Sequence, residues 1–252
     1  MSFAFRVPVM AVVTAVVLAA GPSGVSGAVE AQARGQAPVA GRGTVKGHIQ
    51  LMGKLPGNPV IRMGMDPMCA KANAGKLTVQ ELVVAARDGS LANVFVKLDG
   101  TFAPTPVPSE AVTVDQHGCV YSPRVVGVRT GQTLAVKNSD ALLHNVHGLS
   151  GRNQGFNVGQ PLAGMTNQFR LKEEEVLHLK CDVHSWMNAY IGVVNHPYFA
   201  VTGSGGKFEL KTVPPGTYTV EAWHEKLGRQ TQSVTLGEKD NKEITFTFKA
   251  GA

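Results

Sequence analysis

Hydrophobic and polar residues alternate along several short segments of this chain. Residues 45–51 read Val-Lys-Gly-His-Ile-Gln-Leu, so every second position is apolar or small. The same alternation recurs at residues 94–98, 208–210, 218–222 and 244–248. A period of two places successive side chains on opposite faces of a strand, which predicts strands with one buried face. The Val-Pro-Pro-Gly sequence at 213–216 predicts a turn between two of them, because proline and glycine fix the backbone there.

Helical patterns are scarce by comparison. Residues 68–75 predict a short helical turn, and residues 171–176 predict a locally helical segment. No stretch of the sequence shows the sustained 3.6-residue periodicity of an amphipathic helix. The chain is therefore predicted to be mainly β.

One short segment gathers three metal-binding side chains. Residues 181–187 read Cys-Asp-Val-His-Ser-Trp-Met, which offers a thiolate, an imidazole and a thioether. A blue-copper site uses two histidines and one cysteine with a weak axial methionine, so a second histidine must come from elsewhere in the chain. His144 and His147 follow a strand-like run upstream. If that segment is extended, the two side chains point to opposite faces, and only one of them should reach the metal.

Two other interpretations of these residues are weaker. A structural zinc site normally shows a second Cys-x-x-Cys or histidine pair, and the sequence has none. The alternative without a metal is a buried cysteine, a surface histidine and a core methionine. The combination of soft sulfur and imidazole at this spacing favours copper.

The segments 144–147, His-Asn-Val-His, and 181–187, with its Cys-x-x-His-x-x-Met spacing, resemble the copper loops of cupredoxins, in particular those of amicyanin and plastocyanin. The stretch 112–138 is similar to the part of the family that leads through a hairpin to an asparagine, here Asn138, before the first histidine loop. The resemblance covers about residues 110 to 195. It implies a Greek-key β-sandwich that binds one copper ion.

The cupredoxin resemblance assigns roles to individual residues. Equatorial copper ligands would be His144, Cys181 and His184, and the axial ligand would be Met187. Asn145 would tie the two ligand loops together. Trp186 would shield the copper or belong to an apolar patch that faces a partner.

The resemblance also predicts the route of electrons. At two places, however, this sequence differs from the family's pattern. The imidazole of His184 would lie near the surface and provide the path to a redox partner. Ser185 stands where amicyanin-like loops usually carry proline, and residues 173–175 are three glutamates in place of the family's glycine- and tyrosine-containing approach. These differences affect the rigidity of the loop that carries His184.

A second resemblance concerns the C-terminal part of the chain. Residues 200–210, followed by 213–220, look like carboxypeptidase-regulatory-like domains, which are small transthyretin-like β-sandwiches. Residues 45–49 and 93–96 fit the first half of such a domain. This predicts a sandwich split into 44–106 and 196–250, with a cupredoxin domain, 109–195, inserted between the halves. The alternative is an extended cupredoxin domain followed by a separate C-terminal module.

The N-terminal sequence has the features of an export signal. An apolar run at residues 7–20 follows Arg6, and small residues suggest cleavage near residue 28 or 33. Residues 1–33 are therefore predicted to be a signal peptide, and 34–43 a linker. The run is shorter than the ~20 apolar residues of a membrane span, so the mature protein is expected in the periplasm or outside the cell, without stable membrane insertion. An uncleaved anchor is the alternative.

The chain has three cysteines. If Cys181 binds copper, Cys69 and Cys119 are left, and an oxidising compartment favours a disulfide between them. The alternative is a second metal or redox site formed by both cysteines and His117. That alternative lacks a short-spaced cysteine pair.

Three residues near the C-terminal strands allow two interpretations. His196, His224 and Glu225 could meet near the copper loops as an outer-shell or auxiliary metal site. A histidine on an apolar face is more often a hydrogen-bonded core residue, and the spacing of these three does not require a metal.

Charge and composition narrow the functional classes. The formal net charge is +6, and the basic residues are spread along the chain, which disfavours a nucleic-acid interface. The sequence predicts an exported type 1 copper protein, not an enzyme, that carries single electrons between partners such as a c-type cytochrome or a periplasmic dehydrogenase or oxidase. Copper storage or delivery and a metal-free secreted binding module are the alternatives. A copper oxidase or nitrite reductase is disfavoured because no second His-x-His pair is present.

Overall fold

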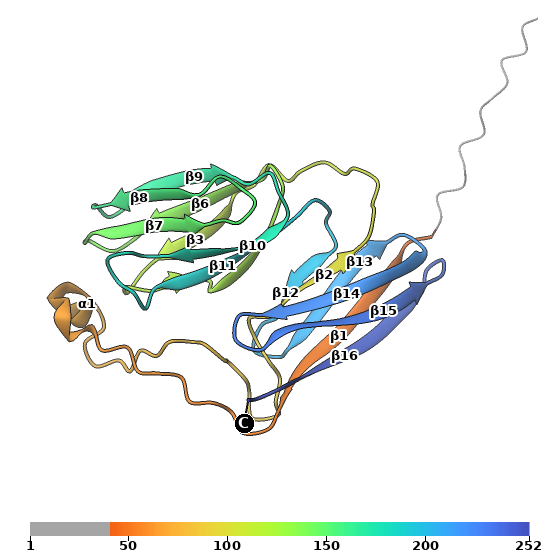
Figure 1. Cartoon of the computed structure of the whole chain (residues 1–252), viewed down its shortest axis with the longest axis horizontal. Coiled ribbons are helices and arrows are strands. Elements are labelled where there is room, and N and C mark those ends of the chain that lie inside the picture. Colours follow the sequence, from red (N-terminus) through yellow and green to blue (C-terminus); the bar gives the residue numbers. More distant parts are fainter. Residues whose placement is uncertain (1–40, 252) are drawn as a thin grey trace, which may run out of the picture. The chain divides into compact units, whose positions relative to one another are not determined.

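The computed structural model describes residues 41–251. The predicted signal peptide and most of the predicted linker lie outside these residues. Almost all regular structure in the described part is β, arranged as four sheets, which confirms the predicted mainly-β fold class (Figure 1). Within the described residues, no helix has both the length and the apolar character needed to cross a membrane.

The middle of the chain forms a sandwich of two sheets. One sheet has the strand order β5-β11-β10-β7-β8, and the other has the order β4-β3-β6-β9. The first comprises β5 (Val125–Arg129), β7 (His144–Leu149), β8 (Phe156–Gln160), β10 (Glu175–Lys180) and β11 (Asn188–Val194). The second comprises β3 (Val112–Gln116), β4 (Tyr121–Ser122), β6 (Thr133–Asn138) and β9 (Thr166–Arg170). Buried aliphatic residues from both sheets form one core between them.

Strands from both ends of the described chain form the other two sheets. Their orders are β13-β1-β16 and β12-β2-β14-β15. The strands are β1 (Gly43–Met52), β2 (Phe95–Asp99), β12 (Phe199–Val201), β13 (Lys207–Val213), β14 (Gly216–His224), β15 (Gly228–Leu236) and β16 (Asn241–Lys249). The orange β1 runs parallel to the dark-blue β16 (Figure 1). The predicted domain boundaries themselves stay a prediction.

Burial follows the predicted alternation in most strands. In β1, Val45, Ile49 and Leu51 are buried, whereas Lys46 is exposed. These apolar side chains enter a core that contains Phe246 of the neighbouring strand β16 and, from the facing sheet, Val96 and Val220. The prediction of local helix at 171–176 is wrong, because residues 171–174 form a loop and residues 175–176 begin β10.

Phe95 breaks the alternation. Its ring is buried on one face of β2, while its neighbours Val94 and Val96 are buried on the other. Its ring lies against Gly127 on β5 and Gly192 on β11, where a Cβ on either glycine would overlap an aromatic ring. Val125 and Val194 complete this small cluster. Phe95 therefore joins the sandwich of β2 to the sandwich of β5 and β11.

A long connection between β1 and β2 carries the only helical segments of the described chain. These are the 3-10 turn η1 (Met63–Met65) and the helix α1 (Pro67–Ala72). Asp66 caps α1, because its side chain accepts hydrogen bonds from the backbone N–H groups of Met68 and Cys69. The helix lies close to the turn predicted at 68–75. A disulfide between Cys69 and Cys119 attaches it to the β3–β4 turn, which confirms the predicted bond.

Candidate metal centre

Three of the predicted ligands come together in the middle sandwich. His144 begins β7, Cys181 follows β10 directly, and His184 lies in the short turn that leads to β11. One ligand atom from each lies within 4.8 Å of the others. All three are at most 2% exposed. Two neighbouring strands and one turn therefore deliver a thiol and two imidazoles to one buried point.

The two imidazoles present the same ring nitrogen to this point. Nδ1 of His144 lies 3.1 Å from Nδ1 of His184. The Cys181 Sγ lies 3.9 Å from the same His184 nitrogen. Soft sulfur combined with two imidazole nitrogens is a donor set that suits copper.

Backbone hydrogen bonds fix the loop that carries Cys181 and His184. The N–H of Cys181 donates to the Met187 carbonyl at 3.1 Å, and the N–H of Met187 donates to the His184 carbonyl at 2.9 Å. Asn145 joins this loop to β7: its N–H donates to Cys181 Sγ at 3.4 Å, and its side-chain oxygen accepts from the N–H of Asp182 at 3.1 Å. These hydrogen bonds hold the loop in place, although Ser185 stands where the resemblance leads one to expect a proline.

Met187 and Trp186 lie beside the three residues. Met187 is 1% exposed and belongs to the same buried cluster as Cys181. The Trp186 ring is centred 5.1 Å from the His184 ring, and its Nε1–H donates to the Cys119 carbonyl at 2.9 Å. Trp186 therefore packs over His184 and is attached to the disulfide-bonded turn.

A buried carboxylate holds the outer nitrogen of His144. Asp140 Oδ2 lies 2.9 Å from His144 Nε2. The two oxygens of Asp140 also accept from the N–H groups of Gly118 and Cys119, each at 2.8 Å. Burial alone would lower the pKa of His144, but the bonds to Asp140 and Cys181 raise it to about 8. Burial likewise opposes ionisation of Asp140, yet these bonds lower its pKa overall.

The electrostatics of Cys181 favour the thiolate. Burial raises the pKa of a thiol, but the His144 ring and the nearby backbone N–H groups lower the pKa of Cys181 below its ordinary value. A thiolate is the form that binds a metal.

His184 differs from the position that the resemblance predicts. It is 2% exposed, not at the surface. Its Nε2 lies 2.9 Å from Asp66 Oδ2 and 3.4 Å from Cys69 Sγ, so the connection that carries α1 covers the ring. The hydrogen bond to His184 is the main reason why the pKa of Asp66 is lowered. The resemblance predicts a His184 near the surface that is open to a partner, whereas the ring is covered by this connection, on which the cupredoxin pattern contains no information.

The other histidines near the site have separate roles. His147 lies on the opposite face of β7 from His144, and its Nδ1 lies 2.9 Å from Asp182 Oδ2. His117 is largely exposed and lies 3.7 Å from Asp140. The alternative of a second metal site with Cys69 and Cys119 is wrong for this state, because both sulfurs are in the disulfide.

His196, His224 and Glu225 do not form a metal site among the described residues. His196 packs against Phe102 with ring centres 4.6 Å apart. His224 Nδ1 accepts the N–H groups of Lys226 and Leu227, and burial lowers its pKa to about 4. Glu225 instead forms a buried ion pair with Arg124. Of the two interpretations of the sequence, the structure agrees with core histidines for His196 and His224, and it places Glu225 in an ion pair.

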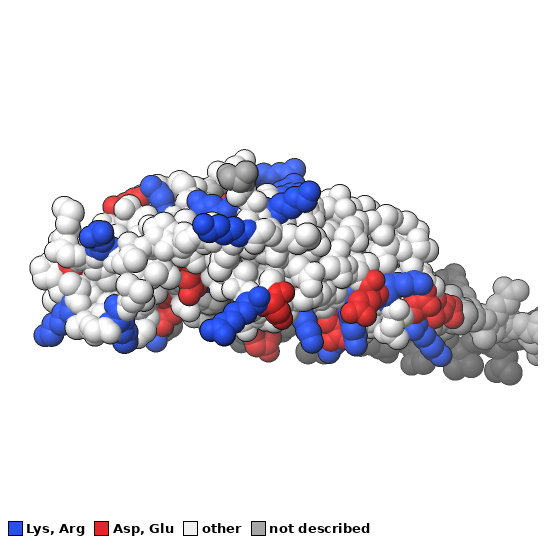
Figure 2. Space-filling view, turned by 90° about the horizontal axis from the view of Figure 1, so that it is seen from below, with Lys and Arg blue, Asp and Glu red and all other residues white. Residues whose placement is uncertain are grey.

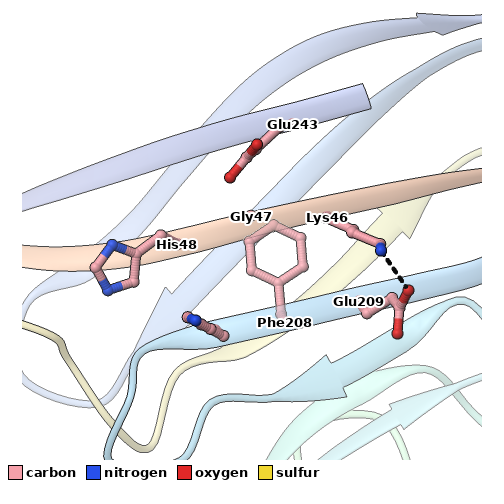
Figure 3. A pocket seen from close by; sticks show the side chains of 7 residues that line it. Lys46, Gly47, His48, Phe208, Glu209 and Glu243 are labelled. Carbon is pink, nitrogen blue, oxygen red and sulfur yellow. Dashed lines mark ion pairs between the residues drawn. The ribbon is translucent and has the colours of Figure 1, made fainter. Parts of the chain in front are cut away.

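Within residues 41–251, the surface features described next offer no comparable donor set. A hollow over β1 and β13 is lined by Lys46, His48, Phe208, Glu209 and Glu243, with Lys46 paired to Glu209 (Figure 3). On the face shown in Figure 2, basic and acidic side chains alternate along the lower edge, and several basic side chains lie near one another in the upper middle.

Asp66 and Asp140 are the functional residues that sequence reasoning missed. Asp140 lies four residues before His144, within a loop of polar residues, and nothing in that spacing identifies it. Asp66 is recognisable as a helix cap before Pro67, but not as a partner of a histidine 118 residues later. Carboxylates that hold the outer nitrogens of metal-binding histidines fix their tautomer and orientation. Their presence on both rings fits a bound metal.

Comparisons with known proteins cover only parts of the chain. The family described as "Polysaccharide lyase family 4, domain II" matches residues 164–244, which is less than half of the sequence. None of the curated proteins matches the chain.

Several solved structures of copper proteins are similar to a part of it. A purple cupredoxin from Nitrosopumilus maritimus is 22% identical, covering 32% of this chain and 97% of that one, with a TM-score of 0.28. A mutant of amicyanin in its Cu(I) form is 22% identical, covering 39% and 97%, with a TM-score of 0.30. A Cu-containing nitrite reductase from Thermus scotoductus SA-01 is 20% identical, covering 38% and 24%, with a TM-score of 0.31. The case for a metal in this chain therefore depends on the side chains described above.

Proposed function

We propose that this protein binds one copper ion in a type 1 site and carries single electrons. The observation that carries the proposal is the buried convergence of Cys181 Sγ with His144 and His184 within 4.8 Å. A bound copper ion would supply one-electron cycling between Cu(I) and Cu(II). Met187, buried in the same cluster, is the proposed axial ligand.

The chain's own residues would keep the ligands in place during electron transfer. Asp140 and Asp66 hold the outer nitrogens of the two imidazoles, which leaves both Nδ1 atoms facing the thiol. Asn145 donates to the thiol sulfur, and hydrogen bonds to this sulfur are one means by which a protein tunes a copper potential. Ligands that are fixed in both oxidation states need little rearrangement when an electron arrives or leaves.

The cellular setting belongs to the same proposal. We infer a periplasmic or secreted protein that exchanges electrons with a redox protein such as a c-type cytochrome or a periplasmic dehydrogenase or oxidase, and that catalyses no reaction itself. The disulfide between Cys69 and Cys119 supports an oxidising compartment. The second sandwich we infer to be carboxypeptidase-regulatory-like, supported by the pairing of β1 with β13 and β16.

Copper storage or delivery is a second candidate. The observation that favours it is the burial of His184 beneath Asp66 and Cys69, which keeps the ring away from a docking partner. Such a cover would slow electron transfer through this ring and also slow copper loss. A storage protein would retain copper without fast electron exchange.

The test is a titration of the purified protein with Cu(II), followed by visible absorption and EPR. The proposal expects an intense thiolate-to-copper band that saturates at one copper per chain, disappears on reduction and returns on oxidation. A reversible potential with fast electron self-exchange supports the carrier. Slow exchange supports storage if the copper is retained in the presence of an acceptor, and delivery if the copper passes to the acceptor. A weak signal of the kind given by copper on surface histidines, or no signal, contradicts both copper functions.

A further inference from the structure

The connection between β1 and β2 is attached to the candidate metal centre by few groups. Of residues 53–81, only Ile61, Met63 and Cys69 are buried, and Met65 is 98% exposed. We call residues 63–73, which comprise η1, α1 and the Asn73 cap, the cover segment. Segments with few buried apolar contacts open locally at low cost in free energy. Met63 and Cys69 attach the cover segment to the core of the middle sandwich, and the disulfide is its covalent link to that sandwich.

Asp66 connects the cover segment to His184 directly. Its Oδ2 accepts from His184 Nε2 at 2.9 Å, while its Oδ1 accepts the N–H groups of Met68 and Cys69 at 2.9 Å each. The position of this carboxylate thus depends on the first turn of α1. The disulfide between Cys69 and Cys119 holds this first turn of the helix.

The other end of the disulfide supports the second histidine. The N–H of Cys119 donates to Asp140 Oδ2, which is the oxygen that lies 2.9 Å from His144 Nε2. Asn73 Nδ2 donates to the Gly118 carbonyl at 2.9 Å and adds a second link between the cover segment and this turn. One covalent bond therefore joins the carboxylate supports of both candidate copper ligands.

We propose that the cover segment is a disulfide-held latch over His184, with Asp66 as the positioning residue of its imidazole. A dithiol reductant would open it: the sulfur–sulfur bond breaks, each cysteine gains one electron and one proton, and the dithiol becomes a disulfide. Opening exposes the His184 ring and lets copper enter or leave. This consequence for copper rests on the proposed function, whereas the exposure of the ring can be measured without any metal.

The test uses the full metal-free chain and diethyl pyrocarbonate, which acylates accessible imidazoles. Peptide mass spectrometry gives the modification rate of His184 relative to two internal references, the partly exposed His147 and the buried His224. In the oxidised protein, His184 should react as slowly as His224. After reduction by dithiothreitol, or in the variant Cys69→Ser/Cys119→Ser, its rate should rise at least ten-fold toward that of His147.

The internal references separate opening of the cover segment from unfolding. If His224 stays protected while His184 becomes reactive, the latch is supported. Equal His184 rates before and after the disulfide is opened overturn it, as does a His184 that is already as reactive as His147 in the oxidised protein. A rise in His224 reactivity together with that of His184 also overturns it, because it means that the disulfide holds the whole fold.

The role of Asp66 has its own readout. Imidazole ¹⁵N chemical shifts report which ring nitrogen carries the proton. In the oxidised metal-free protein, the Nε2–H form of His184 should dominate, and it should lose this dominance in Asp66→Asn. Asp88→Asn is the matched control, because Asp88 also accepts a backbone N–H two residues later but lies outside the site. Unchanged shifts in Asp66→Asn contradict the positioning role.

Copper measurements on unlabelled protein distinguish this inference from the proposed function. They compare the oxidised native chain with the variant Cys69→Ser/Cys119→Ser, because dithiothreitol would itself reduce and bind Cu(II). Copper should load at least ten-fold faster once the disulfide is open. If labelling of His184 depends on the disulfide but no thiolate-to-copper band forms, the latch stands and the copper function fails. If the band forms at the same rate in both states, the copper function stands and the latch fails.

Discussion

Nδ1 of His144 lies 3.1 Å from Nδ1 of His184, with the two rings inclined at 70°. Both nitrogens are therefore directed to the region that Cys181 Sγ also faces. Because each ring is held at Nε2 by a carboxylate, this arrangement does not depend on a bound ion. Side chains that are already in place lose little conformational entropy when a metal ion binds.

The first prediction concerns the thiol. Cys181→Ser replaces an ionisable sulfur with an alcohol, so the intense thiolate-to-copper band should vanish while the two imidazoles still bind copper more weakly. Absorption and EPR after addition of one equivalent of Cu(II) measure this. Ser185→Ala, in the same loop but exposed, is the control and should keep the band. A band of equal intensity in Cys181→Ser would remove the copper assignment.

The second prediction concerns the axial position. Met187→Gln keeps a side chain of similar length but replaces a thioether with an amide oxygen, so copper should remain bound while its reduction potential shifts. Protein-film voltammetry measures the potential. Met65→Gln makes the same chemical change at an exposed site and should leave the potential unchanged. Equal potentials in both variants would exclude Met187 as a ligand.

A third prediction concerns the ion pair between Arg124 and Glu225. Their side chains are only 9% and 3% exposed, and Arg124 Nη2 donates to Glu225 Oε2 at 3.0 Å. Removing one partner of a buried pair leaves the other charge uncompensated, so Glu225→Gln should lower the free energy of unfolding by about 3–5 kcal/mol. Urea denaturation measures it. Glu209→Gln removes a partner from an exposed pair with Lys46 and should have a much smaller effect; equal losses would contradict the prediction.

A fourth prediction concerns acid stability. Burial lowers the pKa of His224 to about 4, from an ordinary value of 6.5. Between these values the unfolded chain binds a proton that the folded chain does not, so this residue's contribution to stability is full above pH 6.5 and falls as the pH drops to 4. At about 1.4 kcal/mol per pKa unit, the loss is about 3 kcal/mol.

His224→Asn removes this proton uptake while keeping an acceptor for the backbone N–H groups of Lys226 and Leu227. The variant should therefore lose less stability than the native protein between pH 6.5 and 4. Urea unfolding at several pH values in this range measures the two slopes. Parallel curves would show that another group is responsible.

The sequence was most informative where chemistry and spacing are local. The alternation at 45–51 predicts a strand because one face of the sheet is buried, and the Cys-x-x-His-x-x-Met spacing predicts one loop with three donors. The alternation of apolar and polar residues does not predict the burial of Phe95. Both faces of β2 are covered there, because the second face meets another sandwich and not water.

The cover over His184 was not predictable for a different reason. Asp66 and His184 are 118 residues apart, and a pair at that separation leaves no periodic signal. The pairing of Cys69 with Cys119 followed from counting cysteines, but the count does not say that the bond lies against a ligand. The ligands were therefore accessible from the sequence, whereas their surroundings depended on the tertiary fold.

The parallel pairing of β1 with β16 also constrains the order of folding. Nine consecutive residues, from Thr44 to Met52, are paired with residues from Asn241 to Lys249. During synthesis, β1 emerges first and must wait for nearly two hundred residues before this neighbour exists. Pairings across such long stretches of chain form slowly, because loop closure precedes any gain from contact. The middle sandwich draws its strands from a continuous stretch of sequence, so it can acquire its core and its ligand geometry while the two ends of the chain are still apart.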